Sequence, residues 1–285
     1  MTSLFLMLLV IGLAPLASGL VLLRPAPRIV PVLRLGSVLL CALAFNLTFF
    51  WQELWLVIPK ALTPGLHPTL YHNDHSWRGD RPVAELLQAT GALATLVSGL
   101  AFLGGLAVTS RASATWRAFL FWMAFQGLSQ SLTQLVIGAI VPGNDVGRAL
   151  AYLGTDAGTK RILLIVAVVL LALAGALLAR VYPLGGDGRA TALTRAFGLE
   201  MLLTTVMATV LIVPFRLPRN LTEVAIVPLL VNLIGAGWLV FGAALVRRKG
   251  VNGNDESPRA VAPALALVLA LFVFQCILRP GIALG

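Results

Sequence analysis

Charged residues are scarce in this chain, and their scarcity excludes a water-soluble fold. Asp, Glu, Lys and Arg make up 11% of the 285 residues, whereas hydrophobic residues make up 59% and the mean hydropathy is +0.93. Soluble domains carry about 25% charged residues, which cover the surface that faces water. A lipid bilayer removes that need, because its acyl chains solvate an apolar exterior. We therefore predict an integral membrane protein.

Several features of common binding and redox sites are also missing. The only two cysteines, Cys41 and Cys276, lie in apolar runs and predict buried thiols rather than a disulfide or a metal pair. No histidine lies inside an apolar run, which argues against haem held between helices. No Gly-rich phosphate loop follows a strand, so we expect no nucleotide. The net charge is +10, but no basic cluster is interleaved with aromatic residues, so we expect no nucleic-acid partner.

Long apolar runs take up most of the chain. Each has the length of a membrane-spanning helix, about 20 residues, and short polar linkers separate them. The first run lacks a preceding basic region, so we interpret it as a span rather than a secretory signal. We predict an all-α fold, a polytopic transmembrane helix bundle of about eight spans that forms a single integral membrane domain over residues 1–285. The predicted spans are 3–23, 36–59, 83–109, 117–141, 162–182, 193–214, 224–246 and 261–278.

Lys and Arg are distributed unevenly between two sets of linkers. Twelve lie in the linkers after the first, third, fifth and seventh runs, and nine lie in the others. Cytoplasmic linkers carry the excess of these residues. We therefore expect both termini and the linkers 60–82 and 142–161 to be extracytoplasmic, in a membrane of the bacterial inner-membrane type. These two linkers share one side in any eight-span topology, so their residues can meet.

The linker 60–82 contains every histidine of the protein: His67, His72 and His75. Neutral imidazole is a good ligand for zinc, copper or iron. His72 and His75 are three residues apart, and one helical turn would place them on the same face. Asp74 suits a ligand or a second residue that orients an imidazole. The alternative interpretation is a solvated loop, since Pro, Gly and Asn in this linker favour turns.

Glu53 is a carboxylate near the end of the second apolar run. Removing a carboxylate from water is costly, so acids within spans usually face the protein interior and are often functional. Asn46 is seven residues earlier, on the same helical face. The alternative is an interfacial position, because Trp51 and Trp55 flank Glu53 as in an aromatic belt.

A polar stripe runs along the fourth predicted span. Gln126, Gln130 and Gln134 recur every four residues on an otherwise apolar helix. The stripe predicts either hydrogen bonds between helices, worth about 0.6 kcal/mol each in lipid, or one wall of a hydrated cavity that also includes Asn46.

The segment 139–148, with the sequence AIVPGNDVGR, follows that span. Asp145 suits the N-cap of a short following helix. The segment also resembles the second motif of site-two-protease-type membrane metallopeptidases, in which an apolar helix ends in an Asp-Gly-Gly sequence. The resemblance implies that Asp145 is a zinc ligand and that Gly147 and Arg148 follow it. Val146 replaces the first glycine, and the His-Glu-x-x-His motif of that family is absent, which puts the remaining ligands in doubt.

Two functions follow as hypotheses. In the first, the chain is a diverged intramembrane metal-dependent hydrolase. His72, His75 and Asp145 bind zinc or another transition metal, His67 is a substitute ligand, and Glu53 is the general base. In the second, the chain is not an enzyme but an accessory subunit bound to other membrane proteins, a small-molecule carrier or a lipid-binding scaffold, and its polar residues serve packing.

Overall fold

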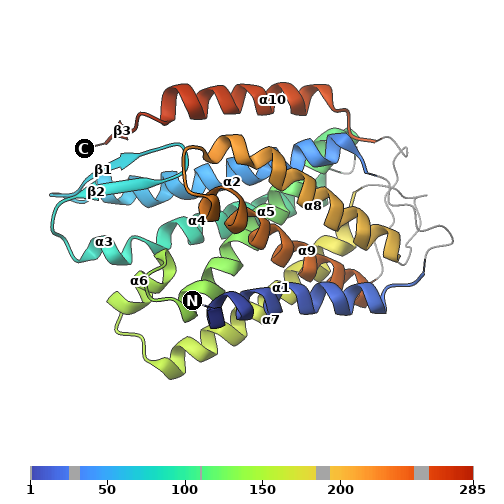
Figure 1. Cartoon of the computed structure of the whole chain (residues 1–285), viewed down its shortest axis with the longest axis horizontal. Helices are drawn as coiled ribbons and strands as arrows, with labels where there is room; N and C mark the ends of the chain where they lie inside the picture. The colour runs from blue at the N-terminus through green and yellow to red at the C-terminus, as the bar shows by residue number, and fades with distance from the viewer. Residues whose placement is uncertain (1, 26–32, 110, 184–192, 247–256, 285) are drawn as a thin grey trace.

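The protein is a bundle of long helices that run side by side along one axis (Figure 1). The computed structural model describes residues 2–25, 33–109, 111–183, 193–246 and 257–284. Two π-helical segments, η1 and η2, adjoin the helices α9 and α10. The helical elements are α1 (Thr2–Leu22), α2 (Leu35–Ala61), α3 (Val83–Leu86), α4 (Ala89–Val108), α5 (Ala114–Ile140), α6 (Asp145–Tyr152), α7 (Ala157–Val181), α8 (Arg195–Arg216), η1 (Thr222–Ile226), α9 (Val227–Leu245), α10 (Val261–Phe272) and η2 (Val273–Leu278).

The bundle confirms the predicted polytopic all-α membrane fold. Six helical segments in the described residues are long and apolar enough to cross a membrane, and a seventh results if α5 and α6, which meet at a 53° bend, form one span. The remaining predicted span corresponds to α1, where the apolar stretch Val10–Leu22 is shorter than the other candidates. The number of spans therefore differs from the expected eight, because one segment is short and one is bent.

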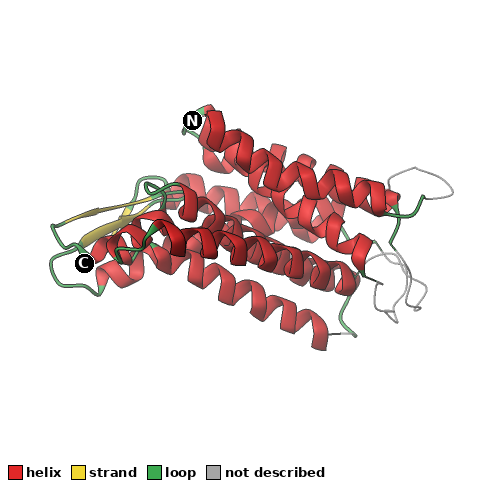
Figure 2. Ribbon diagram, turned by 90° about the horizontal axis from the view of Figure 1, so that it is seen from below, coloured by secondary structure: helices red, strands yellow, loops and turns green. Residues whose placement is uncertain are grey.

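One end of the bundle carries the elements that are not spans. The helices α3 and α6 lie there with a small sheet, and both termini lie toward the same end (Figure 1). Figure 2 shows, from a view at right angles, the strands alongside the helix ends at this end of the bundle. The linkers 60–82 and 142–161 thus lie on one side of the bundle, as the sequence predicts.

A small three-stranded sheet adds to the all-α bundle. Strands β1 (His67–Leu70) and β2 (His75–Arg78) form an antiparallel hairpin, and β3 (Ile282–Ala283) pairs with the other edge of β1. Tyr71 donates its amide to the carbonyl of Asp74 across the turn, at 2.9 Å. The histidine linker is therefore extended rather than helical, so His72 and His75 do not share a helical face.

Small residues bring the central helices together. A Cβ atom on Gly99 of α4 would lie 2.7 Å from the backbone nitrogen of Leu128 on α5, and a Cβ on Gly127 would lie 2.6 Å from the Cα of Gly99. Only glycine permits this approach of two backbones, and such contacts drive helix association in lipid. Close packing of α4 on α5 holds the polar face of α5 toward α2.

The helix α10 lies along the outside of the bundle (Figure 1). Between α10, α2 and α5 is an apolar crevice of about 710 Å³, lined by residues such as Leu43, Phe119 and Leu269. In a bilayer, acyl chains solvate an apolar crevice of this kind.

The two cysteines differ in exposure. Cys276 lies exposed on η2, so the expectation of a buried thiol is correct only for Cys41.

Candidate functional site

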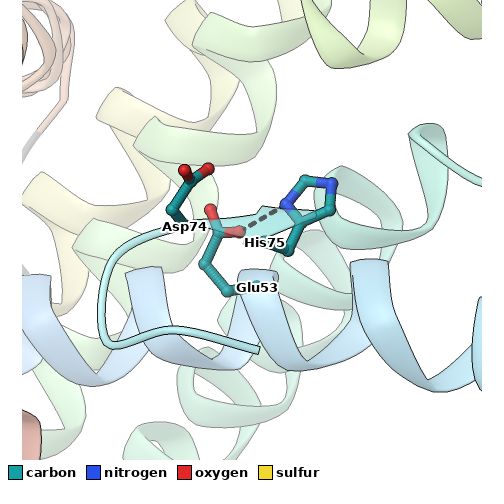
Figure 3. Close-up of side chains that lie close together, drawn as sticks. All are labelled: Glu53, Asp74 and His75. Atoms are coloured by element: carbon teal, nitrogen blue, oxygen red, sulfur yellow. Dashed lines mark hydrogen bonds and ion pairs between the residues drawn. The ribbon is translucent and has the colours of Figure 1, made fainter. Parts of the chain in front are cut away.

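Glu53 and His75 meet beneath the β-hairpin. Glu53 projects from α2 with only 4% of its surface exposed, and Nδ1 of His75 on β2 lies 2.7 Å from its Oε2 atom. Figure 3 shows the two side chains pointing toward each other, with Asp74 beside them. A carboxylate this deeply buried needs a hydrogen-bonding partner, and the hairpin supplies it.

Both ring nitrogens of His75 face acceptors. Nδ1 faces the Glu53 carboxylate, and Nε2 lies 3.1 Å from Oε1 of Gln88. Lys60 also contacts Oε1 of Gln88, at 3.5 Å, which identifies that atom as the amide oxygen because an ammonium can only donate. The imidazole therefore lies between the Glu53 carboxylate and the amide oxygen of Gln88. Glu53, His75 and Gln88 thus form a buried hydrogen-bonded chain.

Trp77 covers this chain from the outside. Its ring stacks on His75 with the centroids 5.8 Å apart. The Nζ atom of Lys60 lies 4.8 Å from the Trp77 ring centroid, and the guanidinium carbon of Arg148 lies 5.0 Å from it. Cations over an indole face are stabilised by its quadrupole. The hairpin, α2 and α6 are therefore joined around one aromatic ring.

The turn of the hairpin is fastened to the end of α8. His72 is buried and its Nε2 lies 3.1 Å from the carbonyl of Leu217, to which it donates. Asn73 donates to the carbonyl of Arg216 at 3.0 Å, and Asp74 forms an ion pair with Arg219. Burial lowers the pKa of His72, so neutral imidazole is favoured there. These contacts hold the last residue of α8, Arg216, against the turn of the hairpin.

A polar cavity of about 200 Å³ lies inside the bundle next to Glu53. It is bounded by α2, α5, α8, α9 and the start of α6. Its apolar lining residues are Phe45, Phe49, Ile137, Val227 and Val231, and its polar lining residues are Gln52, Glu53, Gln130, Thr133, Gln134, Asn144, Asp145 and Arg216. So many polar groups in the interior of a membrane bundle are expensive unless they have partners, and they typically mark a site.

Asp145 reaches this cavity because it is not the helix cap. The side chain of Asn144 caps α6 by accepting from the amide of Gly147 at 3.0 Å, so the prediction that Asp145 caps the helix is wrong. Gly147 has a packing role, since a Cβ there would lie 2.0 Å from the carbonyl oxygen of Val141. The segment that resembles the Asp-Gly-Gly motif therefore forms the tight bend between α5 and α6, and Asp145 at this bend lines the cavity.

The glutamine stripe of α5 forms hydrogen bonds to neighbouring helices, and two of its three residues line the cavity. Gln130 and Gln134 line the cavity, and Gln134 donates to Oε1 of Gln52 on α2. Deeper in the bundle, Gln126 donates to Asn232 of α9 at 3.0 Å. Asn46 donates to the carbonyl of Ala42 on its own helix, at 2.9 Å. Neither Gln126 nor Asn46 lines the cavity, so its inner limit lies between Gln130 and Gln126.

The expected metal ligands are not brought together. Within the described part of the chain, the one group of three potential ligands is Glu53, Asp74 and His75, whose ligand atoms all lie within 4.8 Å of one another. His72 is engaged by Leu217, and His67 is exposed at the start of β1, opposite Arg78. The alternation of side chains along a strand and the reversal at the turn separate the three histidines.

Sequence reasoning missed Lys60, Gln88 and Arg216. Lys60 and Arg216 lie in the last turns of α2 and α8, where basic residues are typical of the ends of spans, and Gln88 lies at the start of an apolar segment. A signal for Lys60 exists, because it follows Glu53 by seven residues and so falls on the same face of α2. Arg216 carries no local signal, since a contact from the hairpin positions it.

No protein-family model matches the chain, and neither the curated proteins nor the solved structures contain a match.

Proposed function

We propose that the protein binds a small polar solute in the cavity beside Glu53, as a small-molecule carrier or solute-binding membrane protein does. The observation that carries the proposal is the 200 Å³ cavity itself, in which two carboxyl groups, a guanidinium, amides and a hydroxyl face one interior space. Groups of this kind fix the orientation of a ligand in a pocket. We infer that this face of the bundle is extracytoplasmic, from the distribution of Lys and Arg.

The size of the cavity favours a metabolite-sized ligand. Pockets for drug-sized molecules measure about 300–1,000 Å³, and one water molecule takes about 30 Å³ of liquid. A volume of about 200 Å³ suits a molecule of a few heavy atoms rather than a lipid or a peptide. The hydroxyl of Thr133 supports the proposal, because it lines the cavity, is 1% exposed, and has no hydrogen-bond partner among the described residues.

Thermal unfolding of the detergent-purified protein tests this proposal. The compounds are free amino acids, polyamines, polyols, sugars and small carboxylates, because a ligand of the native state raises the unfolding temperature with concentration. Thr133→Val removes the unpaired hydroxyl in the cavity. Thr204→Val is the matched control, because that hydroxyl is equally buried and unpaired but lies outside the cavity. At least one compound should raise the unfolding temperature of the wild type. The same compound should raise that of Thr133→Val less, and that of Thr204→Val by as much as in the wild type. Stabilisation by no compound would contradict the proposal.

A second function, a metal-dependent hydrolase, is favoured by the group of Glu53, Asp74 and His75. Two carboxylates and an imidazole are a donor set that zinc, manganese or iron accepts, with a further position for water. In this version Glu53 is a ligand rather than the base, and Asp145, which lines the same cavity, takes the role of the base. A bound metal would acidify a water beside the cavity.

A metal can bind these three residues only if some of their present contacts break. Nδ1 of His75 already faces Glu53, and Asp74 already pairs with Arg219. Metal binding would displace both contacts and bring a cation close to Arg219. We therefore place the metal-dependent function second to solute binding.

A further inference from the structure

Arg216 is a buried cation whose partners are incomplete. It is 6% exposed, its Nε donates to the carbonyl of Glu223 at 2.7 Å, and its guanidinium lies over Phe49 with 4.3 Å to the ring centroid. Among the described residues, no carboxylate forms an ion pair with it. A buried guanidinium has five N–H donors and is costly without an anion. Arg216 borders the cavity, so an anionic group there would complete its coordination.

The opposite charge is present in the same cavity and is also incompletely paired. Asp145 lines it, and no hydrogen bond or ion pair of its carboxyl is found in the described parts of the chain. Glu53 binds His75 through Oε2, while its Oε1 has no hydrogen bond within those parts. A ligand group that donates hydrogen bonds, above all an ammonium, would satisfy these oxygens.

We propose that the cavity takes a small zwitterion, a molecule that carries an amino group and a carboxylate. The carboxylate binds Arg216 and the ammonium binds Asp145 and Oε1 of Glu53. The inference rests on the solute-binding function proposed above and names its ligand class. A ligand with only one charge would leave either the guanidinium or the carboxyl groups desolvated without a partner, which is the situation that burial penalises most.

The remaining lining suits the body of such a molecule. Phe45, Val227 and Val231 line the cavity and offer apolar contact to a short methylene chain, and Gln130, Thr133 and Gln134 line it with groups that form hydrogen bonds. Oε1 of Gln134 and Oγ1 of Thr133 are buried and unpaired among the described residues. The oxygen of Gln134 accepts hydrogen bonds, so it favours the side of the ammonium.

The test compares three series of compounds on the wild-type protein in detergent. The ω-amino acids from glycine to 6-aminohexanoate carry both charges at increasing separation. The n-alkylamines and n-alkyl carboxylates of matching length carry one charge each. Thermal unfolding is measured against the concentration of each compound. We expect one ω-amino acid length to raise the unfolding temperature by several degrees, and the matching amine and carboxylate to raise it far less.

Two variants assign the ends of the ligand. Arg216→Gln should abolish the advantage of the amino acid over the matching amine. Asp145→Asn should abolish its advantage over the matching carboxylate. Arg161→Gln and Asp80→Asn are the matched controls, because both residues are exposed and neither borders the cavity. If a variant does not fold, the proposal is still tested, because the wild type alone shows whether the protein prefers the ω-amino acid to the matching amine and carboxylate.

The outcomes separate this inference from the proposed function. If an amine, a carboxylate or a neutral compound stabilises the wild type as strongly as the matching ω-amino acid, the inference of a zwitterionic ligand is wrong, but the proposal of solute binding is not contradicted. If neither these series nor the wider panel stabilises the protein, both are wrong.

Discussion

Arg148 and Glu85 form a bidentate ion pair that joins the short helices α6 and α3. Nε and Nη2 of Arg148 on α6 lie 2.5 and 2.7 Å from the two carboxylate oxygens of Glu85 on α3. Arg148 also lies over Trp77 of the hairpin. Residues separated by 63 positions in sequence thus hold α6, and with it Asp145, against the Glu53 site.

We expect this pair to contribute little to global stability, because both side chains are about one-third exposed. A double-mutant cycle with Glu85→Gln and Arg148→Gln should give a coupling free energy of about 0.5–1 kcal/mol. Loss of the pair should weaken solute binding more than it lowers the free energy of unfolding, since α6 carries Asp145, which lines the cavity. A coupling of several kcal/mol would mean that the pair is part of the core rather than a clamp on α6.

The pair of Glu53 and His75 should matter more. His75→Ala leaves a buried carboxylate without its donor, which costs about 1–3 kcal/mol, or more for a charged group. The double variant Glu53→Leu, His75→Leu should lose less stability than the sum of Glu53→Leu and His75→Leu, because it removes both partners together. Unfolding in mixed detergent micelles measures these differences. Additive losses would show that the two side chains do not depend on each other.

The sequence predicted the helical bundle because apolar runs and polar linkers are local signals. It also indicated Glu53 and the stripe of Gln126, Gln130 and Gln134, since an acid or repeated amides in an apolar helix stand out individually, although Gln126 lies outside the cavity. The separation of His67, His72 and His75 was not predictable, because strand alternation and the turn decide it. Arg216 was missed for a similar reason, since contacts of Asn73 and His72 from a distant hairpin place it beside the cavity.

The side of the membrane on which each linker lies is directly measurable. Single cysteines at Asp80 and Ala151, in a background with both native cysteines replaced by serine, should react with a membrane-impermeant maleimide from the same side. A cysteine at Ser257 should react from the other side. The charge distribution predicts that Asp80 and Ala151 face the outside. Labelling of all three positions from one side would contradict the arrangement of the bundle.

Metal content separates the two proposed functions. If Glu53, Asp74 and His75 bind a metal, the purified protein should hold about one transition-metal ion per chain by plasma mass spectrometry. His75→Ala should lose it, whereas His72→Ala, the matched control, should retain it because His72 binds Leu217 instead. Retention of metal in His75→Ala would exclude the cluster as the site, and loss in both variants would indicate a general effect of the hairpin.

The most direct test of the central claim is an electron-density map of the protein with the compound that stabilises it most. Solute binding predicts density for that compound within the 200 Å³ cavity, in contact with Thr133 and between Asp145 and Arg216. Density for the compound elsewhere, for example in the apolar crevice between α10 and α2, together with an unchanged cavity, would contradict the account.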